Sequence, residues 1–152
     1  MMSSFGPHLA TGLVVSAIST SACYTYADQL IDSYLYLGLP LLAGVTGALT
    51  PDMDIKSKSS QCMYILYAGL ALYLYYINKV DLAFFTLLYS IIPQFFGHRK
   101  FIHSFIFCLI SSIGLYFIGS YITDNIIFNL IFARTYMMGF ISHILLDKAT
   151  TN

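Results

Sequence analysis

The chain has 152 residues, of which 58% are hydrophobic and only 9% are charged, and its mean hydropathy is +0.75. A soluble domain averages roughly 25% charged residues and needs a polar exterior, so this composition excludes an ordinary soluble protein. The formal net charge of +0 and the lack of a basic stripe exclude a nucleic-acid-binding surface. We therefore expect an integral membrane protein.

Six apolar runs, separated by short connections that hold nearly all the charge, are candidate membrane spans. In chain order they are Phe5–Ala27, Tyr34–Leu49, Cys62–Ile77, Leu82–Phe96, Phe105–Ile122 and Ile126–Leu146. The second and fourth runs are shorter than the about 20 residues of a straight span, and they contain Pro40 and Pro93, which can kink or break a helix. Four to six spans therefore fit the sequence, and six is the best single value.

No linker, repeat or second domain interrupts this pattern. Residues 1–152 are thus expected to form one all-α, polytopic membrane helical bundle with about six transmembrane helices. The 13 Tyr and 12 Phe are expected to be mostly lipid-facing or interfacial packing residues.

The positions of Lys and Arg in the connections predict the orientation of the spans, because cytoplasmic connections are enriched in both. With six spans and a cytoplasmic N-terminus, the inner connections hold Lys56, Lys58, Arg99, Lys100 and Lys148. Only Lys79 then lies in an outer connection. We therefore expect both termini on the cytoplasmic side.

All four histidines and three of the aspartates fall on that same inner side. These seven residues, on four separate segments, are His8, Asp52, Asp54, His98, His103, His143 and Asp147. Imidazole and carboxylate groups are the ligands of divalent metals such as zinc and manganese. The sequence therefore predicts a metal site at the cytoplasmic membrane face.

The segment Thr50–Asp54 presents Asp52 and Asp54 two residues apart on a turn that Pro51 makes rigid. Such a turn can offer two oxygen ligands to one metal, or bridge two metals. The alternative is a helix-terminating turn with solvated acids.

The connection before the fifth span carries His98 and His103 beside the cations Arg99 and Lys100. These cations disfavour imidazolium, so they favour the neutral, metal-binding form of both histidines. Arg99 suits an anionic substrate, because guanidinium binds phosphate or carboxylate bidentately. Ser104 is expected to cap the fifth helix and thereby fix the direction of His103. The alternative is a positive-inside loop with interfacial histidines.

His143 and Asp147 lie four residues apart, on one face of the last helix. Both could bind one metal, or Asp147 could orient the imidazole. Gly139 lies one turn before His143 and would let another helix approach closely, and His8 and Gly12 repeat this spacing. The alternative is a histidine–carboxylate pair near a helix end.

The order of these motifs resembles that of the YdjM-like proteins, a family described as LexA-regulated inner-membrane metal-dependent hydrolases. The family pattern H…LPDxD…HRGxTHS…GxxSHLxxD corresponds in order to His8, Leu49–Asp54, His98–Ser104 and Gly139–Asp147. Thr50, Lys100 and Ile102 depart from it, since the family has Leu, Gly and Thr there. The resemblance spans nearly the whole chain and implies a bacterial inner-membrane location and hydrolase activity.

We interpret the chain as a metal-dependent hydrolase that acts on a phosphoester-bearing lipid at the cytoplasmic membrane face. The seven candidate ligands suit one or two divalent ions, zinc before manganese, and such an ion lowers the pKa of its bound water to about 7. Asp54 or Asp147, whichever is not a ligand, would act as general base, and Arg99 would neutralise charge on the scissile group.

Two other functions stay open at this point. A metal-ion or proton transporter would place His and Asp side chains at several depths of the membrane. A structural metal clamp would have a closed site with no open position for water.

Overall fold

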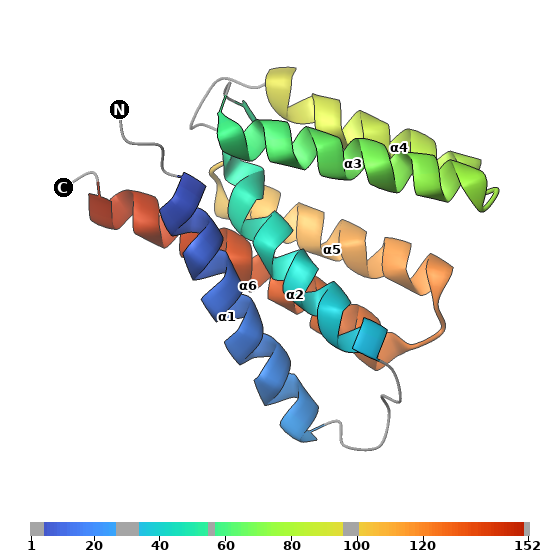
Figure 1. Ribbon diagram of the computed structural model, residues 1–152, viewed down its shortest axis with the longest axis horizontal. Helices are drawn as coiled ribbons and strands as arrows, with labels where there is room; N and C mark the ends of the chain where they lie inside the picture. The colour runs from blue at the N-terminus through green and yellow to red at the C-terminus, as the bar shows by residue number, and fades with distance from the viewer. Residues whose placement is uncertain (1–4, 27–33, 55–56, 96–100, 151–152) are drawn as a thin grey trace.

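The computed structural model describes residues 5–26, 34–54, 57–95 and 101–150. These residues form six α-helices and two 3-10 helices, with no strand among them (Figure 1). The elements are α1 (Phe5–Tyr26), α2 (Tyr34–Leu49), η1 (Thr50–Asp54), α3 (Lys58–Tyr76), α4 (Val80–Ile91), η2 (Ile92–Phe95), α5 (Phe105–Ile122) and α6 (Ile126–Thr150). The predicted all-α class is confirmed.

The local sequence explains where several helices begin and end. Pro51 has no N–H, so α2 cannot continue as an α-helix and the chain passes into η1. Ser57 and Ser60 form a reciprocal capping box at the start of α3. The Phe107 N–H donates to the Ser104 hydroxyl at 3.1 Å, which confirms the predicted cap of α5.

The two prolines inside apolar runs behave differently. α2 continues through Pro40 without a break. At Pro93, by contrast, α4 has already given way to the tighter helix η2. The helical run that starts at Val80 is therefore α-helical for only 12 residues.

Small residues let α1, α2 and α6 approach closely at the centre of the bundle. A Cβ at Gly139 of α6 would collide with the carbonyl group of Gly44 in α2. A Cβ at Gly12 of α1 would lie 2.7 Å from that of Ala48. The predicted close approach of another helix at both glycines is confirmed.

The remaining helices surround this centre. α5 packs on α6, and α3 and α4 form a hairpin whose main backbone contacts with the rest of the bundle run through η1 and η2. α1 begins and α6 ends on the side of the molecule where η1 lies, whereas the α3–α4 turn lies at the far end (Figure 1). The connections that carry the predicted ligands thus meet at one end.

Six transmembrane helices are not confirmed. Within the described residues, α5 and α6 are the two helices long and apolar enough to cross a membrane. α2 has 16 residues and α4 has 12, so at 1.5 Å per residue they rise about 24 and 18 Å, less than the about 30 Å of a hydrocarbon core. All six α-helices nevertheless expose large apolar side chains, as a lipid-facing surface does.

Candidate metal centre

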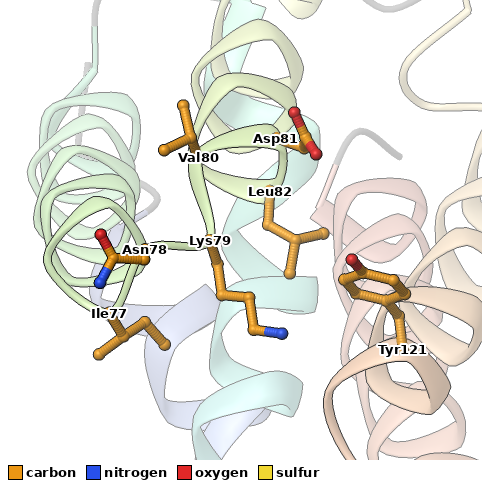
Figure 2. Close-up of a pocket in the computed structure, with 7 residues that line it drawn as sticks. All are labelled: Ile77, Asn78, Lys79, Val80, Asp81, Leu82 and Tyr121. Atoms are coloured by element: carbon orange, nitrogen blue, oxygen red, sulfur yellow. The ribbon is translucent and has the colours of Figure 1, made fainter.

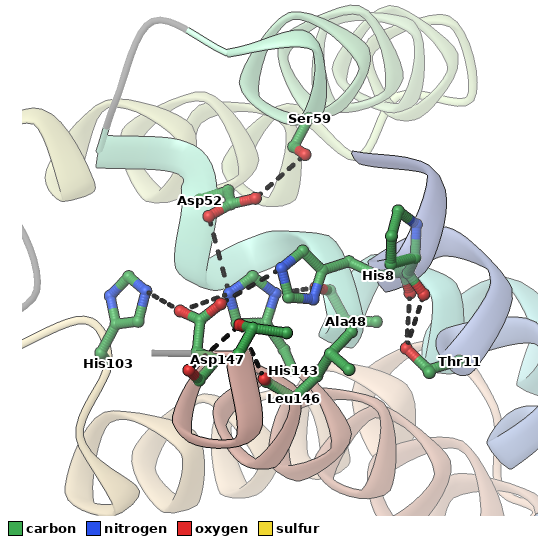
Figure 3. A network of polar contacts seen from close by, with 11 residues as sticks. His8, Thr11, Ala48, Asp52, Ser59, His103, His143, Leu146 and Asp147 are labelled. Atoms are coloured by element: carbon green, nitrogen blue, oxygen red, sulfur yellow. Dashed lines mark hydrogen bonds and ion pairs between the residues drawn. The ribbon is translucent and has the colours of Figure 1, made fainter. Parts of the chain in front are cut away.

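Side chains from four segments meet at one end of the bundle (Figure 3). Five of the seven predicted ligands lie there in the described part of the chain: His8 of α1, Asp52 of η1, His103 just before α5, and His143 and Asp147 of α6. His98 and Arg99 lie outside the described residues, and so does the side chain of Asp54.

His143 is fully buried at the middle of this cluster. Its Nδ1 lies 2.6 Å from the carbonyl oxygen of Ala48, and because a carbonyl only accepts, Nδ1 carries the proton. The other nitrogen, Nε2, then holds a lone pair. It lies 3.6 Å from Asp52 and 3.5 Å from Asp147 and has no hydrogen-bond partner among the described residues. The Ala48 carbonyl thus aims Nε2 at the carboxylates.

His8 lies against His143 with the two rings stacked, 3.8 Å apart and 15° from parallel. Its side chain is buried, and its Nε2 lies 3.2 Å from Asp147. Its Nδ1 is buried and has no hydrogen-bond partner in the described part of the structure. A second imidazole nitrogen is therefore left for a ligand.

Asp147 lies among three imidazoles. Its Oδ1 contacts His8, and its Oδ2 lies 3.5 Å from Nε2 of both His103 and His143. His143 and Asp147, which the sequence places four residues apart on one helix face, are therefore in contact. One carboxylate thereby joins α1, α6 and the residues that precede α5.

Asp52 is held from the other side by α3. The Ser59 hydroxyl donates to Oδ2 of Asp52 at 3.1 Å, which leaves Oδ1 facing His143. Both side chains are buried. The sequence analysis did not identify Ser59, and its only signal is its position in the serine-rich start of α3, directly after the acidic turn.

The cluster contains two overlapping groups whose ligand atoms lie within 4.8 Å of one another: His8, Asp52 and His143, and His103, His143 and Asp147. The mixture of imidazole nitrogen and carboxylate oxygen fits zinc or manganese. A buried polar atom without a partner costs about 1–3 kcal/mol, so the free nitrogens of His8 and His143 also fit a bound cation. Both groups use Nε2 of His143, which can serve one ion at a time.

A family model described as YdjM inner membrane protein matches residues 2–152. The chain belongs to this family. Family membership confirms the resemblance that the motif order carried, and together with the apolar helices α5 and α6 it supports a membrane location. Comparison with curated proteins and with solved structures gave no match.

In this YdjM family member, all four motifs contribute to one place in the fold. The motif around Asp52 supplies the turn η1, and the motif around His143 supplies the part of α6 that faces it. The Ala48 carbonyl, which orients His143, could not be found from sequence because every residue carries such a group.

The YdjM family chain also has a pocket of about 320 Å³ at the far end of the α3–α4 hairpin (Figure 2). Residues 77–82 and Tyr121 line it, and Nζ of Lys79 lies 5.1 Å from the centre of the Tyr121 ring. The pocket contains none of the predicted ligands. Among the described residues, the candidate ligands therefore lie in the cluster around His143 and not at this pocket.

Proposed function

We propose that this chain is a metal-dependent hydrolase that acts on a phosphoester-bearing lipid at the cytoplasmic face of the membrane. The observation that carries the proposal is the pair of overlapping ligand groups that share Nε2 of His143. Two buried imidazole nitrogens of these groups, on His8 and His143, have no hydrogen-bond partner in the described residues. A divalent cation would provide that partner.

Residues of the chain would hold and orient this ion. His8, His143 and Asp52 would bind it on the closed side of the cluster and His103 on the open side, with Ser59 and the Ala48 carbonyl fixing two of these ligands. A bound zinc or manganese ion would lower the pKa of a coordinated water to about 7 and polarise the scissile phosphoester.

The cluster is closed on one side and open on the other. The side chain of His143 is 0% exposed and that of Asp52 is 7% exposed, whereas Asp147 is 24% exposed. A catalytic site needs an accessible position and a structural clamp does not, so this asymmetry favours the hydrolase. Asp147, which is more exposed than Asp52, is suited to accept a proton from the attacking water.

The substrate class follows from the surroundings. The open side of the cluster lies near the ends of apolar helices, where lipid headgroups are the phosphoesters within reach. Arg99, four residues before His103 in the sequence, would neutralise charge on the phosphoester.

The depth of the titratable groups argues against a transporter. Among the described residues, the buried acids and histidines are those of the cluster, and the other buried polar side chains are serines, threonines, Asn129 and Tyr136. A proton or metal relay needs ligands at several depths of the membrane.

Metal content tests the proposal directly. Purified wild-type protein is expected to carry stoichiometric zinc or manganese, and the variants Asp52→Ala and His103→Ala are expected to lose it. Asp81→Ala, an exposed acid at the far end of the hairpin, is the matched control and should keep the metal. Unchanged metal content in both site variants would show that the site is wrongly assigned.

Two assays then separate the functions. Liposomes that contain the metal-loaded protein should release phosphate or headgroup from labelled phospholipids, and Asp147→Asn should abolish this release. Metal uptake into the same liposomes without lipid turnover would instead identify a transporter.

A further inference from the structure

Five hydroxyl groups meet in the interior of the bundle, each from a different element. This hydroxyl cluster consists of Thr50 of η1, Tyr67 of α3, Tyr89 of α4, Ser111 of α5 and Tyr136 of α6. The Tyr89 hydroxyl lies 3.0 Å from that of Tyr136 and donates to that of Ser111 at 3.1 Å. The cluster thus ties the α3–α4 hairpin to α5 and α6.

Thr50 connects the hydroxyl cluster to the end of α2. Its side chain is fully buried, and its hydroxyl donates to the carbonyl of Thr46 at 2.7 Å. The same hydroxyl lies against the Tyr67 and Tyr136 hydroxyls. Thr50 is therefore bonded to α2 and in contact with α3 and α6.

Thr50 also lies midway between two groups of the metal centre. Two residues before it, the Ala48 carbonyl accepts the hydrogen bond from His143. Two residues after it, Asp52 faces His143 and is held by Ser59. The intervening Pro51 restricts the backbone, so a shift of Thr50 would move Ala48 and Asp52 together.

α6 completes the connection. Tyr136 precedes His143 by seven residues, which is about two helical turns, so both side chains lie on the same face of α6. One contact, between Thr50 and Tyr136, therefore joins the segment that carries Asp52 to the helix that carries His143.

We propose that Thr50 is a positioning residue of the metal centre, whose buried hydroxyl, bonded to the Thr46 carbonyl and packed against the tyrosine hydroxyls, fixes the Ala48 carbonyl and the Asp52 carboxylate relative to His143. This inference rests on the proposed metal site and deepens it. It assigns a function to hydroxyl groups that touch neither metal nor substrate.

The test compares zinc affinity, measured by equilibrium dialysis, in two variants of Thr50. Thr50→Val keeps the shape and removes the hydroxyl, and it should weaken zinc binding by about 10- to 100-fold, as the loss of a ligand-orienting group does. Thr50→Ser keeps the hydroxyl and should bind zinc like the wild type. Thr86→Val, which removes an equivalent intrahelical hydroxyl bond at 2.7 Å in α4, is the matched control and should also bind like the wild type.

A second readout needs no metal. In the metal-free protein, the Nδ1 proton of His143 should exchange with solvent faster in Thr50→Val than in the wild type, Thr50→Ser or Thr86→Val, because its acceptor is displaced. If Thr50→Val does not fold by circular dichroism, Tyr136→Phe removes one hydroxyl that faces Thr50 and should give the same two changes.

The outcomes separate this inference from the function on which it rests. A wild-type protein that binds neither zinc nor manganese would overturn both. Zinc binding by the wild type that Thr50→Val leaves unchanged, or that Thr86→Val lowers equally, would overturn the role of Thr50 alone.

Discussion

The carbonyl oxygen of Ala48 and Nδ1 of His143 lie 2.6 Å apart, at the crossing of α2 and α6. Ala48 reaches this place because Gly12 and Gly139, in α1 and α6, leave room for it. The backbone of Ala48 thus has two roles: α1, α2 and α6 pack together around it, and its carbonyl orients a proposed metal ligand. Stability of the bundle and geometry of the site depend on the same few atoms.

The hydrogen bond between the Ala48 carbonyl and Nδ1 of His143 predicts which nitrogen of His143 binds metal. We expect nitrogen-15 NMR of the metal-free protein to show His143 protonated on Nδ1, because the Ala48 carbonyl can only accept. Added zinc should shift the Nε2 resonance and leave the Nδ1 proton in place. A proton found on Nε2, or a shift of Nδ1 on zinc addition, would contradict the prediction.

Because α2 and α6 approach closely at Gly139, a single methyl group added there should lower the stability of the bundle. Gly139→Ala would drive a Cβ into the Gly44 carbonyl, and we expect it to lower the free energy of unfolding by about 1–3 kcal/mol. Gly114→Ala in α5 is the matched control, since its Cβ would meet nothing within 4 Å. It should leave stability unchanged or raise it by about 0.5–1 kcal/mol, as an Ala in a helix does.

Denaturant titration in detergent micelles, followed by circular dichroism, measures both changes. The Gly139→Ala variant should also bind zinc more weakly, since the Ala48 amide lies 3.1 Å from the position of the added Cβ. Equal stability of the two variants would mean that the helices do not meet at Gly139.

The hydrogen bond from Ser59 to Asp52 predicts a change in metal affinity with little change in fold. We expect Ser59→Ala to weaken zinc binding by about tenfold, because Asp52 loses the group that holds Oδ2. Ser112→Ala removes another buried serine hydroxyl, whose bond at 2.8 Å stays within α5, and should not alter zinc affinity. Isothermal titration calorimetry distinguishes the two, and equal affinities would exclude a role for Ser59.

Orientation in the membrane stays a prediction from the Lys and Arg positions, and reporter fusions test it. A fluorescent protein after Asn152 should be fluorescent, because that end is expected in the cytoplasm. A cysteine placed at Asn78, in a variant without the native cysteines, should react with a membrane-impermeant maleimide added outside intact cells. Labelling only after lysis would reverse the predicted orientation.

The sequence predicted the helices well because apolar runs and their interruptions mark them. α2 and α5 begin and end at the predicted residues, and Ser104 caps α5 as expected. The number of membrane spans was harder to predict, because length and apolarity of a run do not by themselves make it cross the bilayer. The gathering of five candidate ligands at one end of the bundle was also predictable, because the Lys and Arg positions assigned their connections to the same side.

The Tyr and Phe side chains were expected to be mostly lipid-facing or interfacial, and Tyr89 and Tyr136 are two exceptions, because their hydroxyls meet inside the bundle. In a helix that is apolar all round, the sequence pattern does not show which face is buried. The proposed roles of Thr50, Ser59 and the Ala48 carbonyl could not be predicted from the sequence for a related reason. Each acts through a partner on another helix, and only the packing of the helices reveals that partner.

Zinc should stabilise the folded protein, because its proposed ligands come from α1, η1, α6 and the residues before α5. A ligand at 100 times its dissociation constant stabilises a fold by about 2.7 kcal/mol, provided that it binds only the folded state. We therefore expect the unfolding temperature to rise with zinc concentration in the wild type and in Asp81→Ala. Asp52→Ala, which removes the proposed ligand that lies between Ser59 and His143, should lose most of this rise. A rise of equal size in Asp52→Ala would mean that zinc stabilises the protein at another place.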